Sequence, residues 1–211
     1  RARAELAADH VRLALLNAGL PWSPPRHACE LGFGQGVSVN LHAAGHARAR
    51  WYGTDFNPAQ AGFAQELARD AGAGAQLFDE SFAEFCRRDD LPTFDFVGLH
   101  GIWSWISDEN RAAIVDFLRR KLAVGGVLYV SYNTLPGWSA AAPLRHLMTQ
   151  HAERLSGTGY GITARVDAAL GFTQQVIDTQ PLYMAANPAL ADRFAKLKDH
   201  SRSYLAHEYF N

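Results

Sequence analysis

The sequence predicts an α/β fold: a doubly wound, mostly parallel sheet with helices on both faces, followed by a helical C-terminal region. Up to about residue 136, short apolar runs typical of buried strands alternate with longer runs of helical periodicity. Beyond residue 136, helical runs follow one another with no strand-like run between them. Because parallel strands need crossover helices, the alternating part favours a parallel sheet.

The N-terminal residues predict a helix over 1–19, because Leu6, Val11 and Leu15 recur at helical spacing and Gly19 ends the pattern. At least five strands follow, with the runs HACEL, RWYGTD, AQLF, FDFVGLH and GVLYVSY. Helices are expected between them over residues 36–46, 57–71, 81–88 and 108–122. Three more helices are expected over residues 143–155, 163–180 and 188–209.

These elements indicate an N-terminal helix in residues 1–24, a ligand-binding sheet domain in 25–137 and a helical lid region in 138–211. A net charge of −1 gives no electrostatic reason to expect nucleic acid as a partner. No apolar run approaches the roughly 20 residues that span a bilayer, so we expect a cytoplasmic protein without a membrane span. Because the chain starts at Arg1, we expect it to be a piece of a longer protein.

A glycine-rich loop follows the first expected strand, in E-L-G-F-G-Q-G at residues 30–36. Glycine accepts positive φ and has no Cβ, so this loop lets a ligand approach the backbone and the first turn of the next helix. The dinucleotide pattern G-x-G-x-x-G would need glycine in place of Val37 or Val39. No Lys-Ser or Lys-Thr follows, as a phosphate loop requires. A ligand-binding turn of another type is predicted, and a tight turn without a ligand stays open.

Asp55 ends the second expected strand, about 20 residues after the glycines, where an acidic residue accepts hydrogen bonds from ribose hydroxyls. The loop and the acid together favour a nucleoside ligand. The alternative is that Asp55 caps the helix that begins near Pro58, a role that Asn57 can fill equally well.

Four segments resemble motifs of the class I S-adenosylmethionine-dependent methyltransferases: E-L-G-F-G-Q-G, G-T-D at 53–55, F-D-F-V-G-L-H-G at 94–101 and V-G-G-V-L-Y-V-S-Y-N at 124–133. L-H-G-I-W-S-W-I-S, Y-N-T-L-P-G-W and L-A-H-E-Y-F-N resemble the bacterial group with an appended methyltransferase regulatory domain, some of whose members methylate protein lysines. The resemblance implies a Rossmann-like sheet under a C-terminal helical lid. The last two of the family's seven strands and the regulatory domain are expected beyond residue 211.

The resemblance implies that S-adenosyl-L-methionine is the cofactor. The glycine backbone would face its methionine and ribose part, with Glu30 orienting the loop. Asp55 would accept the ribose hydroxyls, Phe56 would lie against the adenine, and residues 79–82 would meet the adenine edge. The residues implied to bind the cofactor are Glu30, Gly32, Gly34, Gly36, Asp55, Phe56, Ser81, Phe82 and His100, with Asp79 and Glu80 as alternatives to Ser81 and Phe82.

The methyl acceptor is expected after the fourth and fifth strands, because ligands of open parallel sheets bind beyond the carboxyl ends of the strands. Aromatic side chains there would wall a slot beside the sulfonium cation, and His100 would relay a proton. The catalytic candidates are His100, Trp103, Tyr132 and Asn133, with Trp105, Pro136 and Trp138 as further wall residues. Backbone hydrogen bonding by His100, packing by the tryptophans and capping by Asn133 stay open as alternatives.

Two other patterns carry little weight. His42 and His46 stand four residues apart, but no carboxylate or cysteine is in register with them, so no metal site is predicted. Ser139 lies in a degenerate nucleophile-elbow pattern, too far from a strand end for a hydrolase. Cys29 and Cys86 make neither a disulfide framework nor a zinc site.

The resulting hypothesis is an S-adenosylmethionine-dependent methyltransferase that methylates lysine side chains of proteins. A small-molecule O- or N-methyltransferase and a non-catalytic S-adenosylmethionine-binding module are the alternatives. The partner is then a methyl-acceptor protein or small molecule. The oligomeric state and the number of methyl groups transferred stay open.

Overall fold

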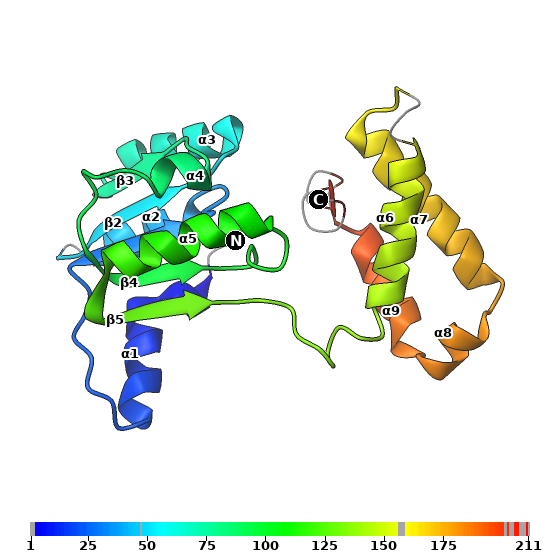
Figure 1. Ribbon diagram of the computed structural model, residues 1–211, viewed down its shortest axis with the longest axis horizontal. Helices are drawn as coiled ribbons and strands as arrows, with labels where there is room; N and C mark the ends of the chain where they lie inside the picture. The colour runs from blue at the N-terminus through cyan, green and yellow to red at the C-terminus, as the bar shows by residue number, and fades with distance from the viewer. Residues whose placement is uncertain are drawn as a thin grey trace. The chain divides into compact units, whose positions relative to one another are not determined.

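The computed structural model describes residues 3–46, 48–155, 159–200, 202, 205–206 and 210. Contacts divide the chain into two compact units, Arg1–Tyr132 and Asn133–Asn211. The first unit holds all the described strands and the second is helical (Figure 1). Each unit is described by itself, and the domain boundary expected between residues 137 and 138 stays a prediction.

The first unit alternates strands and helices along the chain. Its strands are β1 (His27–Leu31), β2 (Arg50–Thr54), β3 (Ala75–Phe78), β4 (Phe94–Leu99) and β5 (Leu122–Val130). Its helices are the 3-10 turn η1 (Ala4–Leu6), α1 (Ala8–Asn17), α2 (Val37–Gly45), α3 (Pro58–Asp70), α4 (Phe82–Phe85) and α5 (Asp108–Lys121). None of the helices in the described ranges is long and apolar enough to cross a membrane.

The sheet has the order β3-β2-β1-β4-β5, and every pair of neighbouring strands is parallel. The predicted doubly wound α/β fold is therefore confirmed. Because β1 lies between β2 and β4, the carboxyl ends of these three strands come together at one edge of the sheet. This edge, which we call the carboxyl edge, carries the loops in which the sequence predicts a ligand.

Both faces of the sheet are covered by apolar side chains, as a parallel sheet requires. One face packs against α4 and α5, through Phe85 and Phe117 among others. The other face packs against η1, α2 and α3, through Leu6 and Val39 and the small side chains of Ala61 and Ala64. These alanines let α3 approach closely, which brings its first turn next to the glycine loop.

Two predicted boundaries were wrong. The helix expected over residues 1–19 is divided, because Ala7 has extended backbone (φ −68°, ψ 123°) between η1 and α1. This break lets Leu6 turn into the core, where it is fully buried. The fifth strand starts at Leu122, earlier than expected, because Leu122 already pairs with Phe94. A bulge that contains Gly125 (φ 80°) then separates this pair from the pair of Val127 with Phe96.

The second unit consists of α6 (Ala142–Leu155), α7 (Ile162–Asp178), α8 (Leu182–Ala186) and α9 (Ala189–Lys198). Its core contains Met148, Val166, Leu170 and Phe194, which all lie on inward faces of these helices. The expected helices over 143–155 and 163–180 agree closely with α6 and α7. The last helix, expected over 188–209, corresponds to α9, which ends at Lys198. Its predicted end, Tyr209, lies outside the described residues.

We predict that Gly53→Ala destabilises the first unit. A Cβ at position 53 in β2 would lie 2.6 Å from the backbone oxygen of Glu30 and 2.9 Å from the ring of Phe33. Backbone of a central strand moves little, so overpacking here should cost about 1–3 kcal/mol of unfolding free energy in urea titrations.

Gly62→Ala in α3 is the matched control. A Cβ at position 62 meets no atom within 4 Å, and alanine is favoured over glycine inside a helix by about 0.5–1 kcal/mol. Equal effects of the two substitutions would contradict the close packing of β2 on β1.

Candidate functional site at the carboxyl edge of the sheet

The glycine loop between β1 and α2 follows a path that side chains would block. Gly32, Gly34 and Gly36 all have left-handed backbone, with φ of 73°, 60° and 68°. A Cβ at Gly36 would lie 2.4 Å from the Cβ of Ala64 in α3, and one at Gly32 would lie 2.9 Å from Ile102. Gly36 is the N-cap of α2, and no side chain caps that first turn. The N–H groups there are therefore suited to bind an anionic or polar ligand.

Asp55 fastens this loop to the end of β2. Its Oδ2 accepts a hydrogen bond from the backbone N–H of Gly34 at 2.8 Å, and its Oδ1 accepts one from Asn57 at 3.0 Å. Asn57, not Asp55, caps α3, since its Oδ1 accepts hydrogen bonds from the first-turn N–H groups. Each Asp55 oxygen keeps a second lone pair for a ligand hydroxyl. Phe56, directly after it, is 55% exposed.

Glu30 is a buried acid at the end of β1, with 4% of its surface exposed. Its Oε2 has no hydrogen-bond partner among the described residues. Burial raises the pKa of Glu30 to about 8, the charge of Arg3 lowers it, and the charge of Asp55 raises it further. At neutral pH Glu30 is therefore mostly protonated. A cationic group bound beside it would favour loss of that proton.

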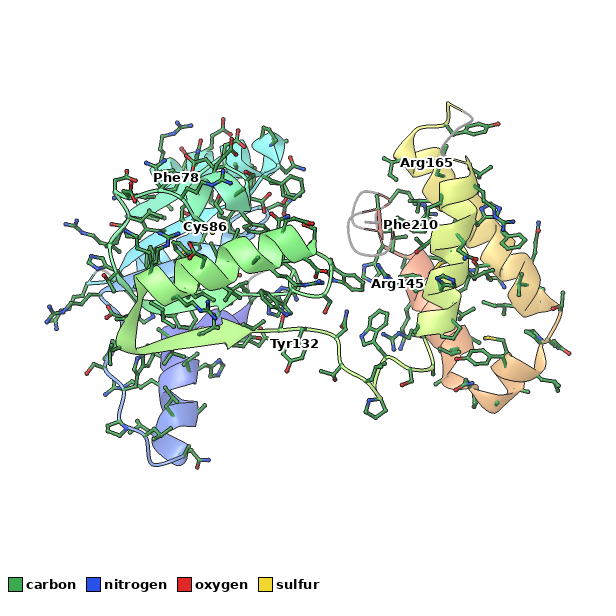
Figure 2. The ribbon with its side chains drawn as sticks, in the orientation of Figure 1. Phe78, Cys86, Tyr132, Arg145, Arg165 and Phe210 are labelled. Carbon is green, nitrogen blue, oxygen red and sulfur yellow. The ribbon has the colours of Figure 1, made fainter. Side chains whose placement is uncertain are left out.

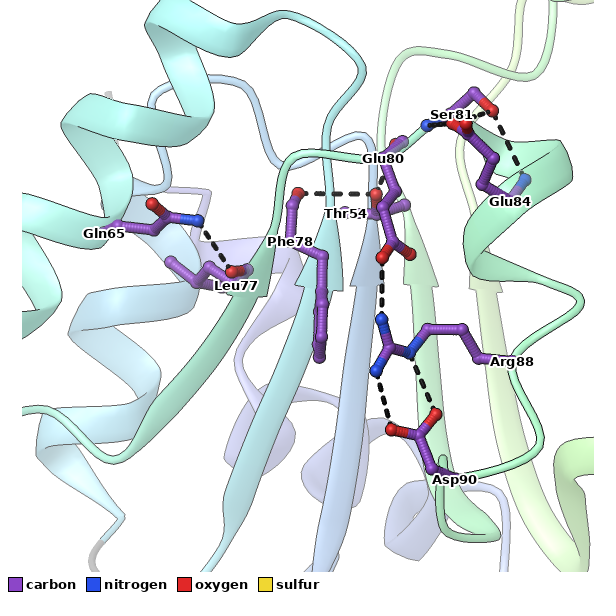
Figure 3. A network of polar contacts seen from close by, with 9 residues as sticks. All are labelled: Thr54, Gln65, Leu77, Phe78, Glu80, Ser81, Glu84, Arg88 and Asp90. Carbon is purple, nitrogen blue, oxygen red and sulfur yellow. Dashed lines mark hydrogen bonds and ion pairs between the residues drawn. The ribbon is translucent and has the colours of Figure 1, made fainter.

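A polar network holds the loop after β3 (Figure 3). The Thr54 hydroxyl donates to the backbone oxygen of Glu80, which ties this loop to β2. Arg88 donates to the Glu80 carboxylate at 2.7 Å and makes two hydrogen bonds to Asp90. The Arg88 guanidinium also lies 4.3 Å above the ring of Phe78, the last residue of β3. Glu80 is thus engaged in fixing the loop.

The two residues predicted to meet the adenine edge, Ser81 and Phe82, have structural roles in the folded protein. Ser81 is the N-cap of α4 and forms a capping box with Glu84. Phe82 is 7% exposed and packs in the core beside Gly32. Asp79 is exposed and next to Glu80. The loop still lies at the carboxyl edge, so ligand contact through its backbone or Asp79 stays open.

His100 lies at the end of β4 and pairs with a residue that the sequence analysis missed. The hydroxyl of Tyr129 in β5 lies 3.3 Å from His100 Nδ1, and the two rings are parallel at 6.1 Å. Burial, and then the charge of Arg3, lowers the pKa of His100, so its imidazole is neutral at pH 7. Burial and the charge of Glu5 raise the pKa of Tyr129. The pair is an uncharged donor and acceptor.

A second contact joins the same strand ends. The Gly101 N–H donates to the Ser131 hydroxyl at 2.7 Å, and the Ser131 N–H donates to the oxygen of Leu99. Neither Ser131 nor Tyr129 was predicted as a site residue, because their contacts depend on the register of β4 against β5. The strand-end location of both residues was the available signal.

The remaining acceptor-site candidates are divided between the two units. Trp103 packs against the core beside α4 and α5, and its backbone oxygen accepts a hydrogen bond from Arg111. Tyr132, labelled in Figure 2, is the last residue of the first unit and is 60% exposed. Asn133 and Trp138 belong to the second unit, where Trp138 lies under the guanidinium of Arg193 at 4.3 Å.

His42 and His46 have separate surroundings. His42 is buried and stacks on Trp51 with ring centres 5.3 Å apart, while His46 lies 3.6 Å from the Asp9 carboxylate. Within the described ranges, no three His, Cys, Asp or Glu side chains are grouped as a metal site would require.

The sequence of the first unit is similar to a known protein family. The family model described as "Methyltransferase domain" matches residues 28–126, the segment from β1 into β5. An uncharacterized protein of Synechocystis sp. is 48% identical over 184 residues, which cover 87% of this chain and 36% of that protein. An uncharacterized protein of Rickettsia prowazekii is 29% identical over 182 residues, which cover 85% of this chain and 32% of that protein.

Two solved structures share the fold. The structure of PKMT2 from Rickettsia typhi in complex with AdoHcy has a TM-score of 0.73 at 24% identity, covering 100% of this chain and 40% of that chain. A further structure of PKMT2 from Rickettsia typhi has a TM-score of 0.62 at 26% identity, covering 87% of this chain and 34% of that chain. This chain spans less than half of the matched chain in each of these four comparisons.

We predict that Glu30→Gln changes how stability depends on pH. The pKa of Glu30 is about 8 in the folded protein and near its ordinary value of 4.5 when unfolded. Between these values the unfolded chain loses a proton that the folded protein keeps, so the wild type loses stability as pH rises. Glutamine cannot ionise, so the unfolding free energy of the variant should rise relative to that of the wild type by up to about 1.4 kcal/mol per pH unit between these two pKa values.

Urea unfolding at about pH 5 and about pH 8 measures the difference. Glu66→Gln, at an exposed position of α3, is the matched control and should keep the pH dependence of the wild type. Parallel pH profiles for Glu30→Gln and the wild type would contradict a protonated Glu30.

Proposed function

Residues 28–126 form a class I S-adenosylmethionine-dependent methyltransferase domain, and from this premise we propose that the protein binds S-adenosylmethionine at its carboxyl edge and transfers the methyl group to an acceptor. The observation that carries the proposal is the glycine loop held by Asp55 beside an uncapped helix start. This arrangement combines a close backbone approach with a carboxylate suited to ribose hydroxyls.

The residues at this edge fit the parts of the cofactor by their chemistry. The glycine loop and the first turn of α2 suit the methionine and ribose part. Asp55 suits the ribose hydroxyls, and the exposed ring of Phe56 suits the adenine face. Glu30, protonated in the free protein, would ionise beside the positive charges of the cofactor. The contacts predicted for Ser81 and Phe82 with adenine stay in the proposal as contacts made by the backbone of the loop that holds these two residues.

When bound, S-adenosylmethionine would supply a methyl group activated by its sulfonium: an acceptor lone pair would attack the methyl carbon in line, the carbon–sulfur bond would break, and S-adenosylhomocysteine would leave with the bonding pair. The protein's task is then to position the acceptor and exclude water. The neutral pair of His100 and Tyr129 lies at the strand end where this proposal puts the acceptor. A neutral imidazole can accept the proton that an attacking amine loses. Trp103 and Tyr132 of the first unit complete the proposed acceptor side, and a catalytic role of Asn133, the first residue of the second unit, stays a prediction.

We propose lysine side chains of proteins as the acceptors. The support is the resemblance of Y-N-T-L-P-G-W and its companion motifs to a group with lysine-methylating members. A small-molecule O- or N-acceptor is the second candidate, because neither His100 nor Tyr129 selects a protein lysine over a small amine or hydroxyl group. The helical lid, the regulatory domain and the cytoplasmic location stay predictions.

Calorimetric titration of S-adenosylmethionine into the full-length protein tests the cofactor. We expect micromolar binding, and Asp55→Ala should weaken it tenfold or more, about 1.4 kcal/mol, by removing both the ribose partner and the loop contact. NAD is the control ligand, and Asp70→Ala, at the end of α3, is the control variant. Absence of binding by the folded wild-type protein would refute the proposal.

Incubation with methyl-labelled cofactor and cell lysate tests the acceptor. We expect label in protein, recovered as methyl-lysine after hydrolysis, and a loss of at least tenfold in rate for His100→Ala measured at saturating cofactor. Label confined to small molecules would favour the second candidate. Binding without turnover on any acceptor, unchanged by His100→Ala and Tyr132→Phe, would identify a non-catalytic cofactor-binding module.

A further inference from the structure

The N-terminal residues 3–6 lie against the carboxyl edge of the sheet, although the sequence pattern assigned them to a separate helix. The backbone N–H of Arg3 donates a hydrogen bond to the Ser38 hydroxyl at 2.8 Å. Ser38 is in the first turn of α2, directly after the glycine loop, and is 4% exposed. Arg3 is thus held beside the loop that the proposed function assigns to the cofactor.

Leu6 provides the second attachment of this segment. Its side chain is fully buried and packs on β4 at Gly98, two residues before His100. A Cβ at position 98 would lie 2.6 Å from Leu6 Cδ2 and 3.3 Å from the ring of Phe96. The missing side chain at Gly98 is therefore what lets Leu6 lie on the sheet. Residues 3–6 are fixed at both ends, at α2 and at β4.

The charge of Arg3 acts on three strand ends at once. It lowers the pKa of Glu30 at the end of β1, of His100 after β4 and of Tyr129 in β5. Arg3 itself is exposed and forms no salt bridge with any of the described residues. Two acids act on the same strand ends as Arg3: Glu30, which is mostly protonated at neutral pH, and Glu5, whose charge raises the pKa of His100 and of Tyr129. The positive charge of Arg3 is therefore available to a ligand.

We propose that Arg3 is a cofactor-binding residue whose guanidinium holds the carboxylate at the methionine end of S-adenosylmethionine. This inference rests on the proposed function. That carboxylate is the single anionic group of the cofactor, and a planar guanidinium binds carboxylates through paired, charge-assisted hydrogen bonds. The first turn of α2, next to Ser38, offers the same carboxylate N–H groups and a positive dipole end.

The packing of Leu6 on Gly98 has a positioning role in this arrangement. It fixes residues 3–6 on the face of β4, so that the arginine is held beside the loop before any ligand arrives. A segment whose backbone is already ordered loses less conformational entropy on binding than a free one. Leu6→Ala should therefore weaken binding of the same part of the cofactor as Arg3→Ala does.

The test compares two ligands that differ in the methionine end alone. S-adenosylhomocysteine carries the carboxylate, whereas 5′-methylthioadenosine keeps the nucleoside and the thioether without it. Calorimetry on the full-length protein should show that Arg3→Ala weakens S-adenosylhomocysteine binding tenfold or more and leaves 5′-methylthioadenosine binding within twofold. Arg3→Lys should recover part of the loss, because lysine keeps the charge but not the paired donors.

Arg12→Ala is the matched control, since Arg12 is an exposed arginine of α1. Equal weakening of both ligands by Arg3→Ala would overturn the inference, because it would mean a general effect on the loop. Unchanged binding of both ligands by a folded Arg3→Ala variant would also overturn it and leave the proposed function intact. Failure of the wild-type protein to bind either ligand would refute the proposed function together with the inference.

Discussion

The close approach of backbone segments at the carboxyl edge is the constraint on which the rest of the site depends. β1, β2, α2 and α3 meet there at positions where no side chain fits, as at Gly36 against Ala64 and Gly53 against the Glu30 oxygen. The Asp55 carboxylate then locks the arrangement by bonding to Gly34 and Asn57. Because α3 packs against the loop and Asp55 accepts a hydrogen bond from it, the shape of the loop is set before a ligand binds.

The electrostatics of this edge follow from the same packing. Burial keeps Glu30 protonated and His100 neutral, so the strand ends carry little charge although they hold several ionisable groups. A positively charged ligand bound beside Glu30 would favour ionisation of that carboxyl, which would then balance part of the ligand's charge. The loop after β3 differs, because its ionisable groups are paired as ions. Arg88 bridges the carboxylates of Glu80 and Asp90, and the main effect of this network is to hold the loop in place.

The sequence was sufficient to predict the fold and to propose a site at the carboxyl edge, because both rest on local signals. Strand and helix runs, the glycine spacing and the acid after β2 are all visible in single segments. The pairing of His100 with Tyr129 and the contact of Arg3 with Ser38 were not predictable, since they join residues 29 and 35 positions apart through strand register and packing. The start of β5 was missed for a similar reason: Leu122 pairs with Phe94 before a bulge that contains Gly125 (φ 80°), and only strand register shows that pairing.

The central location of β1 has a consequence for the synthesis of the protein. β1 pairs with β2 soon after both are made, but its other neighbour, β4, starts at Phe94. Until that strand has left the ribosome, one edge of β1 and the apolar face under Leu6 have no partner, and such edges recruit other chains. During synthesis β1 therefore passes through a stage with one unpaired edge that can associate with other chains. The speed of translation through residues 50–100 sets how long that stage lasts.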